Sequence, residues 1–157
     1  MPVAMPHVRH NYLAIAVAAV ASFIFEMAWY SVFLDTWLKG VGHDRAWLEH
    51  TGASPVLQFG AALLAEALIA VSISLVTQMT GPQTALRGVK VGAALWLGLV
   101  LPTIAVGAVF AELNYASFAV DAGFWLGAMV VMGAIVGAWK KKDRDQRSGA
   151  RDQGKLD

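Results

Sequence analysis

Two carboxylates lie inside long apolar stretches of this 157-residue chain, where charged side chains are unusual. Glu26 stands within FIFEMAWYS, and Glu66 stands near the middle of the next apolar segment. An ionised side chain at the centre of a bilayer costs about 2.5–3.5 kcal/mol or more. Because the sequence predicts no Lys or Arg at their depth, either the two acids are protonated, or they hold a cation, or water reaches them from the outer side.

These acids have two alternative interpretations. The first makes Glu66, with Glu26, a proton or cation site of a small carrier or channel, because intramembrane acids are functional candidates. Asp121, Glu112 and Asp35 then form an acidic mouth. In the second interpretation, neutral Glu26 and Glu66 hydrogen-bond across helices and specify the packing. We favour the second, because the chain is short and its sequence shows no pair of broken helices.

Helical spacing predicts which side chains accompany the acids. The second segment repeats small or polar residues every fourth position: Gln58, Ala62, Glu66, Ala70, Ser74 and Gln78. On the first segment Tyr30 follows Glu26 by four residues and therefore shares its face. On the third segment we expect Thr103 beside a kink, because Pro102 removes a backbone donor. The candidate buried polar or ion site comprises Glu26, Glu66, Asp121, Tyr30 and Thr103.

The composition predicts the elements that hold these residues. The chain is 57% hydrophobic and 15% charged, whereas an average soluble domain is roughly 25% charged. We expect membrane spans at 12–34, 55–76, 89–110 and 118–139, because about 20 apolar residues cross a hydrocarbon core and such spans are helical. The predicted fold is all-α, an integral membrane four-helix up-down bundle over residues 1–139. The basic segment 140–157 lacks apolar periodicity and is predicted to be a disordered tail.

The distribution of basic residues predicts the orientation. Lys and Arg gather around the termini and the second loop, at Arg9, Arg87, Lys90, Lys140, Lys141, Lys142, Arg144 and Arg147. The other side has only Lys39 and Arg45. We therefore expect an inner-membrane protein with both termini cytoplasmic. We expect no cleavage after Ala21, because the apolar run continues beyond the length of a signal-peptide core.

Small residues on the last segment predict close helix packing. Gly123 and Gly127, and likewise Gly133 and Gly137, have the GxxxG spacing that lets helices approach in lipid. Their partner is either another helix of this chain or a second copy. The expected partners are thus the lipid bilayer and a homo-oligomer or larger membrane complex. The net charge of +1 gives no argument for nucleic acid.

Residue types argue against an enzyme, a metal site or a cofactor. There are no cysteines, which removes thiolate ligands and nucleophiles. His43 and His50 flank the outer-loop sequence DRAWLE, and His7 and His10 precede the first segment, at spacings unlike a compact metal site. The sequence has no phosphate-binding loop or nucleophile elbow. We expect no catalytic residues and no cofactor.

Four stretches carry a family resemblance: NYLAIAVAAVASFIF with AWYS, then LWLG, DAGFW and MGAIVGAW. In this order they resemble the domain-of-unknown-function family numbered 1761, small bacterial four-span membrane proteins. The resemblance implies the four-span layout and no mechanism. The family pattern commonly has a small residue where this chain has Glu26, and proline where it has Val32. The resemblance therefore implies that Asp121 matters more widely than Glu26.

The leading interpretation is a non-enzymatic accessory or structural membrane component. The alternative is a small proton- or cation-linked permease or channel that uses Glu66, Glu26 and Asp121.

Overall fold

The computed structural model describes residues 11–50, 52 and 54–140, and all its regular elements are helices. The elements are α1 (Tyr12–Gly40), α2 (Arg45–His50), α3 (Pro55–Met79), α4 (Ala85–Leu95), the π-helical turn η1 (Trp96–Val100), α5 (Leu101–Phe110) and α6 (Tyr115–Ala138). α4, η1 and α5 follow one another as one span, so four helices are long and apolar enough to cross a membrane. The predicted all-α class is confirmed. His7, His10, Arg9 and the predicted tail beyond Lys140 lie outside the described residues.

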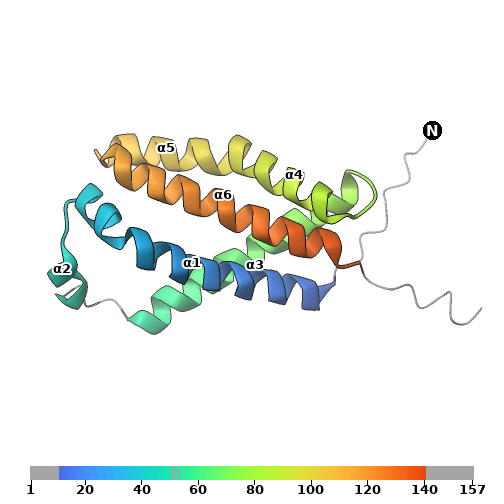
Figure 1. Cartoon of the computed structure of the whole chain (residues 1–157), viewed down its shortest axis with the longest axis horizontal. Helices are drawn as coiled ribbons and strands as arrows, with labels where there is room; N and C mark the ends of the chain where they lie inside the picture. Colours follow the sequence, from blue (N-terminus) through green and yellow to red (C-terminus); the bar gives the residue numbers. More distant parts are fainter. Residues whose placement is uncertain (1–10, 51, 53, 141–157) are drawn as a thin grey trace, which may run out of the picture.

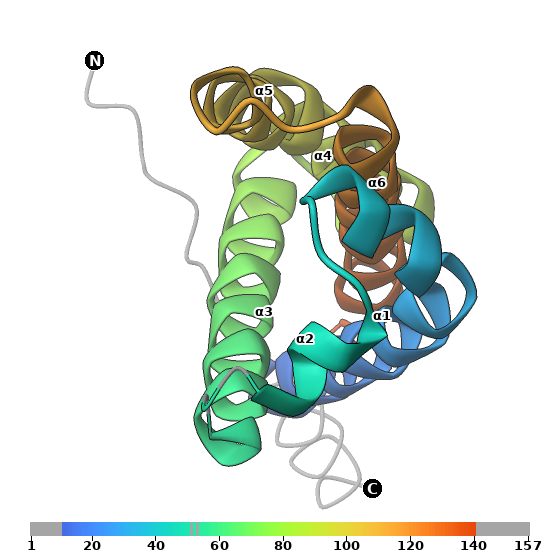
Figure 2. The same ribbon diagram turned by 90° about the vertical axis from the view of Figure 1, so that its left-hand side faces the viewer.

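The spans run alternately up and down, so the two described chain ends meet at one end of the bundle (Figure 1). There the side-chain amide of Asn11 donates a hydrogen bond to the carbonyl of Trp139, at 3.3 Å. We call this the termini end. At the opposite end, the loop end, the amide of Asn114 donates to the carbonyl of Gly40, at 3.1 Å. Figure 2 views the bundle from the loop end, with α2 in front.

The first helix is longer than the predicted span of 12–34, because α1 continues to Gly40. The two polar residues just beyond the predicted end, Asp35 and Thr36, are exposed. Leu38, in contrast, is 1% exposed and extends the buried face. The helix ends where Gly40 lies against Ser117 of α6, a contact so close that a Cβ on Gly40 would collide with the serine.

Helix α6 is the centre of the bundle and packs most closely against α4 and α1. Its contact with α4 is made backbone to backbone. A Cβ on Gly88 or on Gly133 would collide with the carbonyl oxygen of the other, and a Cβ on Gly92 would collide with that of Met129. Gly137 lies equally close to the carbonyl of Thr84. Only glycine permits this approach.

The other two predicted packing glycines contact α1. Gly123 lies under the indole of Trp29, where a Cβ would stand 2.9 Å from the ring. Gly127 lies under Phe25 in the same way, at 2.6 Å. At all four predicted positions the glycine thus packs against another helix of the same chain.

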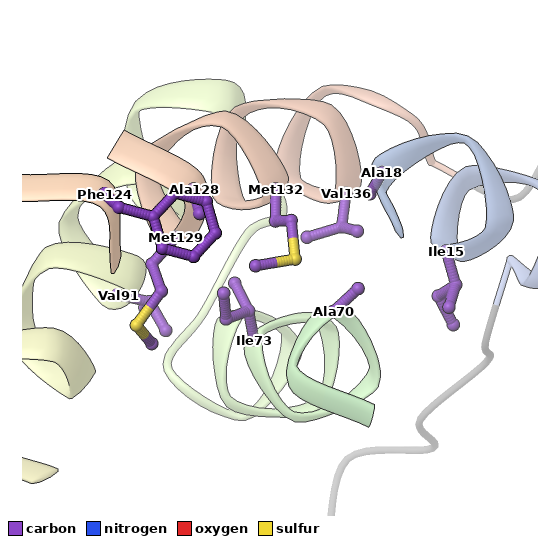
Figure 3. Packing of buried hydrophobic residues seen from close by; sticks show 10 residues of the cluster. All are labelled: Ile15, Ala18, Ala70, Ile73, Val91, Phe124, Ala128, Met129, Met132 and Val136. Atoms are coloured by element: carbon purple, nitrogen blue, oxygen red, sulfur yellow. The ribbon is translucent and has the colours of Figure 1, made fainter. Parts of the chain in front are cut away.

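A core of buried apolar residues fills the bundle from its middle toward the termini end (Figure 3). It joins α1, α3, α4 and α6 through Ile15, Ala18, Ala70, Ile73, Val91, Phe124, Ala128, Met129, Met132 and Val136. Five of these side chains have 0% exposure, namely Ala128 and a group of four made of Ala18, Ala70, Ile73 and Met132. We call these four residues the apolar break, because they lie between Glu66 and the buried polar Ser74 nearer the termini end.

The third span is irregular where the sequence predicts a kink. η1 ends directly before Leu101 and Pro102, and the amide of Leu101 donates to the carbonyl of Trp96. A π-helical turn holds an extra residue, so it changes the direction in which the next helix faces. α4 buries Gly88, Val91 and Gly92, whereas no residue of Leu101–Phe110 is buried. The loop end of the bundle is consequently more open than the termini end.

Candidate functional site

Glu66 is the most enclosed acidic side chain among the described residues, with 1% exposure. It lies on the face of α3 that also buries Ala70 and Ser74, as the four-residue spacing predicts. Its Oε1 accepts a hydrogen bond from the hydroxyl of Ser22, at 2.8 Å. Its Oε2 is buried and has no hydrogen-bond partner in the described part of the chain. Glu66 therefore joins α3 to α1 and keeps one oxygen for a proton or a cation.

Glu26 follows Ser22 by one helical turn on α1 and is half-buried. Its carboxyl group interacts electrostatically with Glu66 and with the hydroxyl of Tyr30. Its Oε2 is also buried, with no partner among residues 11–50, 52 and 54–140. Glu26 is thus near enough to Glu66 to act on it electrostatically. A carboxyl pair without a cationic partner is more stable when at least one member is protonated.

Tyr30 connects these acids to α6. Its hydroxyl donates to Oδ1 of Asp121 at 2.6 Å, a length typical of a hydroxyl bound to a carboxylate. The ring of Trp37 stands edge-on to Tyr30, with centroids 6.1 Å apart. The buried indole N–H of Trp37 lies near the carboxylate of Asp121. Asp121 is thus held between α1 and α6 at the loop-end side of Glu26.

Together these groups form a line along one face of α1. We call it the carboxyl line and define it as Ser22, Glu66, Glu26, Tyr30 and Asp121. Successive α1 members are four residues apart and so share a face. The line begins at the middle of the bundle and leads toward the loop end. Carboxyl and hydroxyl groups both donate and accept hydrogen bonds, so such a line can hold and exchange protons.

The line does not continue to the termini end within the described helices. The next buried polar group on this face of α3 is Ser74, about 12 Å beyond Glu66 along the helix axis. Between them lies the apolar break, where Ala70 packs in the core with Ala18 and Met132. The carboxyl line is therefore closed on its termini side by packed apolar side chains.

Other sequence-predicted residues lie apart from the line. Thr103 is exposed, and its hydroxyl donates to the carbonyl of Leu99 in its own span, at 2.6 Å. Asp35 is exposed and pairs with Arg45 at 2.7 Å, which raises the pKa of the arginine. Glu112 is exposed in the turn between α5 and α6. The predicted pocket at Thr103 and the predicted acidic mouth are thus not formed around Asp121.

Two features of the site were not predicted. The α4 glycines Gly88 and Gly92 oppose Gly133 and Met129, although their own four-residue spacing in RGVKVGAAL is visible in the sequence. The position of Trp37 beside Asp121 depends on the longer α1, and no local sequence signal marks it.

The histidines considered for a metal site serve other contacts. The ring of His43 stacks on Trp47, with centroids 4.1 Å apart. A ring nitrogen of His50 lies 2.8 Å from the carbonyl of Ala46. Within the described residues, no three His, Asp or Glu side chains converge to hold a metal ion.

Four apolar helices, arranged up and down around a central α6, define a multi-pass helical membrane protein. The sequence matches the family described as "Protein of unknown function (DUF1761)" over residues 13–137, and the chain belongs to this family. The resemblance seen in the sequence is thereby confirmed. The searches of curated proteins and of solved structures find no match.

Proposed function

We propose that this protein is a non-enzymatic accessory or structural component of the bacterial inner membrane, in which the carboxyl line fixes how the helices pack. The observation that carries the proposal is the apolar break. Residues with 0% exposure separate Glu66 from the termini end, so the bundle has no continuous polar path from one end to the other within its described residues. A line of acids that stops halfway supports a role in joining the helices.

The hydrogen bonds of the line suit this role. Ser22–Glu66 joins α1 to α3, and Tyr30–Asp121 joins α1 to α6. In lipid, apolar side chains do not drive helices together, whereas interhelical hydrogen bonds contribute about 0.6–2 kcal/mol each. Because each bond requires one register between its helices, the pair of bonds selects a single arrangement around α1.

For the orientation, we propose that both termini are cytoplasmic. Asn11 and Trp139 are hydrogen-bonded at one end, and the sequence adds Arg9 before them and a run of Lys and Arg after them. Basic residues next to spans favour the cytoplasmic side. Reporter fusions after Trp139 and within the α1–α2 connection test this, and periplasmic activity of the fusion after Trp139 contradicts it.

Association with a second copy or with a larger membrane complex is part of the proposal. The four α6 glycines already face α4 and α1, so a partner has to use other lipid-facing surfaces, such as those of α1, α3 and α5. α5 has no buried residue in the described structure, so much of its surface is available to a partner.

A second candidate function is a proton- or cation-linked permease, and the unpaired Oε2 atoms of Glu66 and Glu26 favour it. In this mechanism a proton enters near Asp121, passes Tyr30 and reaches Glu26 and Glu66. It leaves toward the termini end only when the apolar break opens. Buried acids without a counter-ion are typical of proton relays in membrane transporters.

Flux measurements in liposomes separate the two functions. Wild type, Glu66→Gln and the control Glu49→Gln, an exposed acid on α2, are reconstituted and tested for proton and monovalent-cation flux. Their size-exclusion profiles and thermal unfolding verify the fold. The accessory function predicts equal, background flux in all three. Flux in wild type and Glu49→Gln that is lost in folded Glu66→Gln overturns it and supports the permease.

A further inference from the structure

The loop end holds a cavity of about 670 Å³ between α5 and the start of α6, separate from the carboxyl line. Its lining includes Ala105, Ala108, Val109, Glu112, Asn114 and Phe118. The volume lies within the range of small-molecule sites, which is about 300–1,000 Å³. The cavity exists because α5, which follows the π-helical turn, does not pack closely against α6.

The cavity has an apolar wall and an acidic rim. Ala105, Ala108 and Val109 come from the span itself and form a smooth wall that extends into the hydrocarbon region. At the rim, Glu112 is exposed and has a positive φ of 53°. The structure gives Glu112 no ion pair with any described residue. The site therefore presents an acyl-chain surface below one uncompensated carboxylate.

The rim also lies at the level of lipid headgroups. Glu112 and Asn114 occupy the turn between two spans. Tyr115, beside them, is 89% exposed, and tyrosine is enriched where a span meets the membrane interface. Asn114 uses its side-chain oxygen to cap α6 through the amide of Ala116, which leaves its amide nitrogen to donate to a headgroup oxygen.

We propose that this cavity binds a phospholipid with a primary ammonium headgroup, of the phosphatidylethanolamine type. The ammonium group donates hydrogen bonds to the Glu112 carboxylate, while an acyl chain lies on the alanine wall. A choline headgroup has no N–H to donate, and an anionic headgroup is repelled by Glu112. The lipid thus fills the space that the π-helical turn leaves between α5 and α6.

Lipid titrations of the purified full chain, read by native mass spectrometry, test the proposal. The probes are phosphatidylethanolamine, phosphatidylcholine and phosphatidylglycerol with identical acyl chains. We expect phosphatidylethanolamine to bind wild type about fivefold more tightly than phosphatidylcholine, the ratio that one exposed ion pair supplies. Glu112→Gln removes this preference, whereas Glu49→Gln, an exposed acid on α2, retains it.

A second pair of variants tests the cavity itself. Ala108→Phe fills the wall and reduces the binding of phosphatidylethanolamine, while Ala119→Phe, on the exposed surface of α6, does not. Equal affinity of wild type for the three lipids overturns the proposal. A preference for phosphatidylethanolamine that Glu112→Gln leaves unchanged overturns it as well. Neither result bears on the carboxyl line, because Glu112 lies outside it.

Discussion

Toward the termini end, α4 and α6 approach through Gly88 and Gly133 until their backbones touch. Toward the loop end the same two spans separate, and α6 instead presents Asp121 to Tyr30 of α1. The half of the bundle toward the termini end is closely packed around an apolar core. The half toward the loop end is more open and is joined by side-chain hydrogen bonds.

The difference shows two ways to hold helices together in lipid. Lipid tails are as apolar as a protein core, so association depends on close van der Waals contact or on hydrogen bonds. Glycine supplies the contact where α4 meets α6. Polar side chains supply the bonds where α1 meets α3 and α6, and at the α1–α6 contact Gly123 and Gly127 also let the helices approach. The carboxyl line therefore lies in the hydrogen-bonded half of the bundle, and the apolar break lies in the closely packed half.

The largest expected effect comes from filling the glycine contact. Gly133→Ala places a methyl group against the carbonyl of Gly88, and such overpacking costs about 1–3 kcal/mol or more. Thermal unfolding in detergent measures the loss. Gly107→Ala is the control, because a Cβ there meets no described atom within 4 Å, so its stability stays equal or rises slightly. Equal stability of Gly133→Ala and wild type contradicts the contact.

A smaller loss is expected when Glu66 loses its partner. Ser22→Ala leaves a buried carboxyl group without a hydrogen bond, which costs about 1–3 kcal/mol. Ser72→Ala is the matched control, because the exposed Ser72 bonds only to the carbonyl of Leu68 in its own helix. The same unfolding assay measures both variants. If Ser22→Ala and Ser72→Ala unfold at the same temperature, the hydrogen bond between Ser22 and Glu66 does not stabilise the bundle.

The smallest expected effect belongs to Tyr30→Phe. It removes the hydroxyl that Asp121 accepts but keeps the ring packed on Phe124, with centroids 5.4 Å apart. We expect a loss of about 0.6–1.7 kcal/mol, the range of interhelical bonds in lipid. Tyr115→Phe, whose residue is 89% exposed, is expected to equal wild type. If Tyr115→Phe loses as much stability as Tyr30→Phe, the loss is not specific to the hydrogen bond between Tyr30 and Asp121.

The sequence predicts the architecture because span length and charge placement are properties of the chain alone. The four spans are visible as long apolar segments. The inward stripe of α3 around Glu66 and the glycine face of α6 are visible as periodic patterns. The end of α1 was predicted too early, since Asp35 and Thr36 are polar but face outward while Leu38 remains buried. Chain polarity alone does not say which side of a helix faces a neighbour.

The periodic pattern of one helix does not show which residues of the other helices it contacts. Thr103 was expected in the polar site, but the π-helical turn at Trp96–Val100 changes the face that α5 presents, and its hydroxyl bonds within its own span. The opposing glycines on α4 have a visible spacing, yet only the packing reveals that they meet Gly133. Which residues meet depends on how the helices are aligned against one another. The sequence of a single helix does not determine that alignment.

The central claim is that packed apolar side chains close the carboxyl line toward the termini end. Because the chain has no cysteine, a single Ser22→Cys variant in oriented vesicles tests it with a small membrane-impermeant thiol reagent. Thr36→Cys and Thr80→Cys, exposed near the loop end and the termini end, verify the sidedness. We predict that the Ser22 variant, whose residue is 0% exposed, is not modified by reagent on the termini side, and its modification from that side would contradict the account.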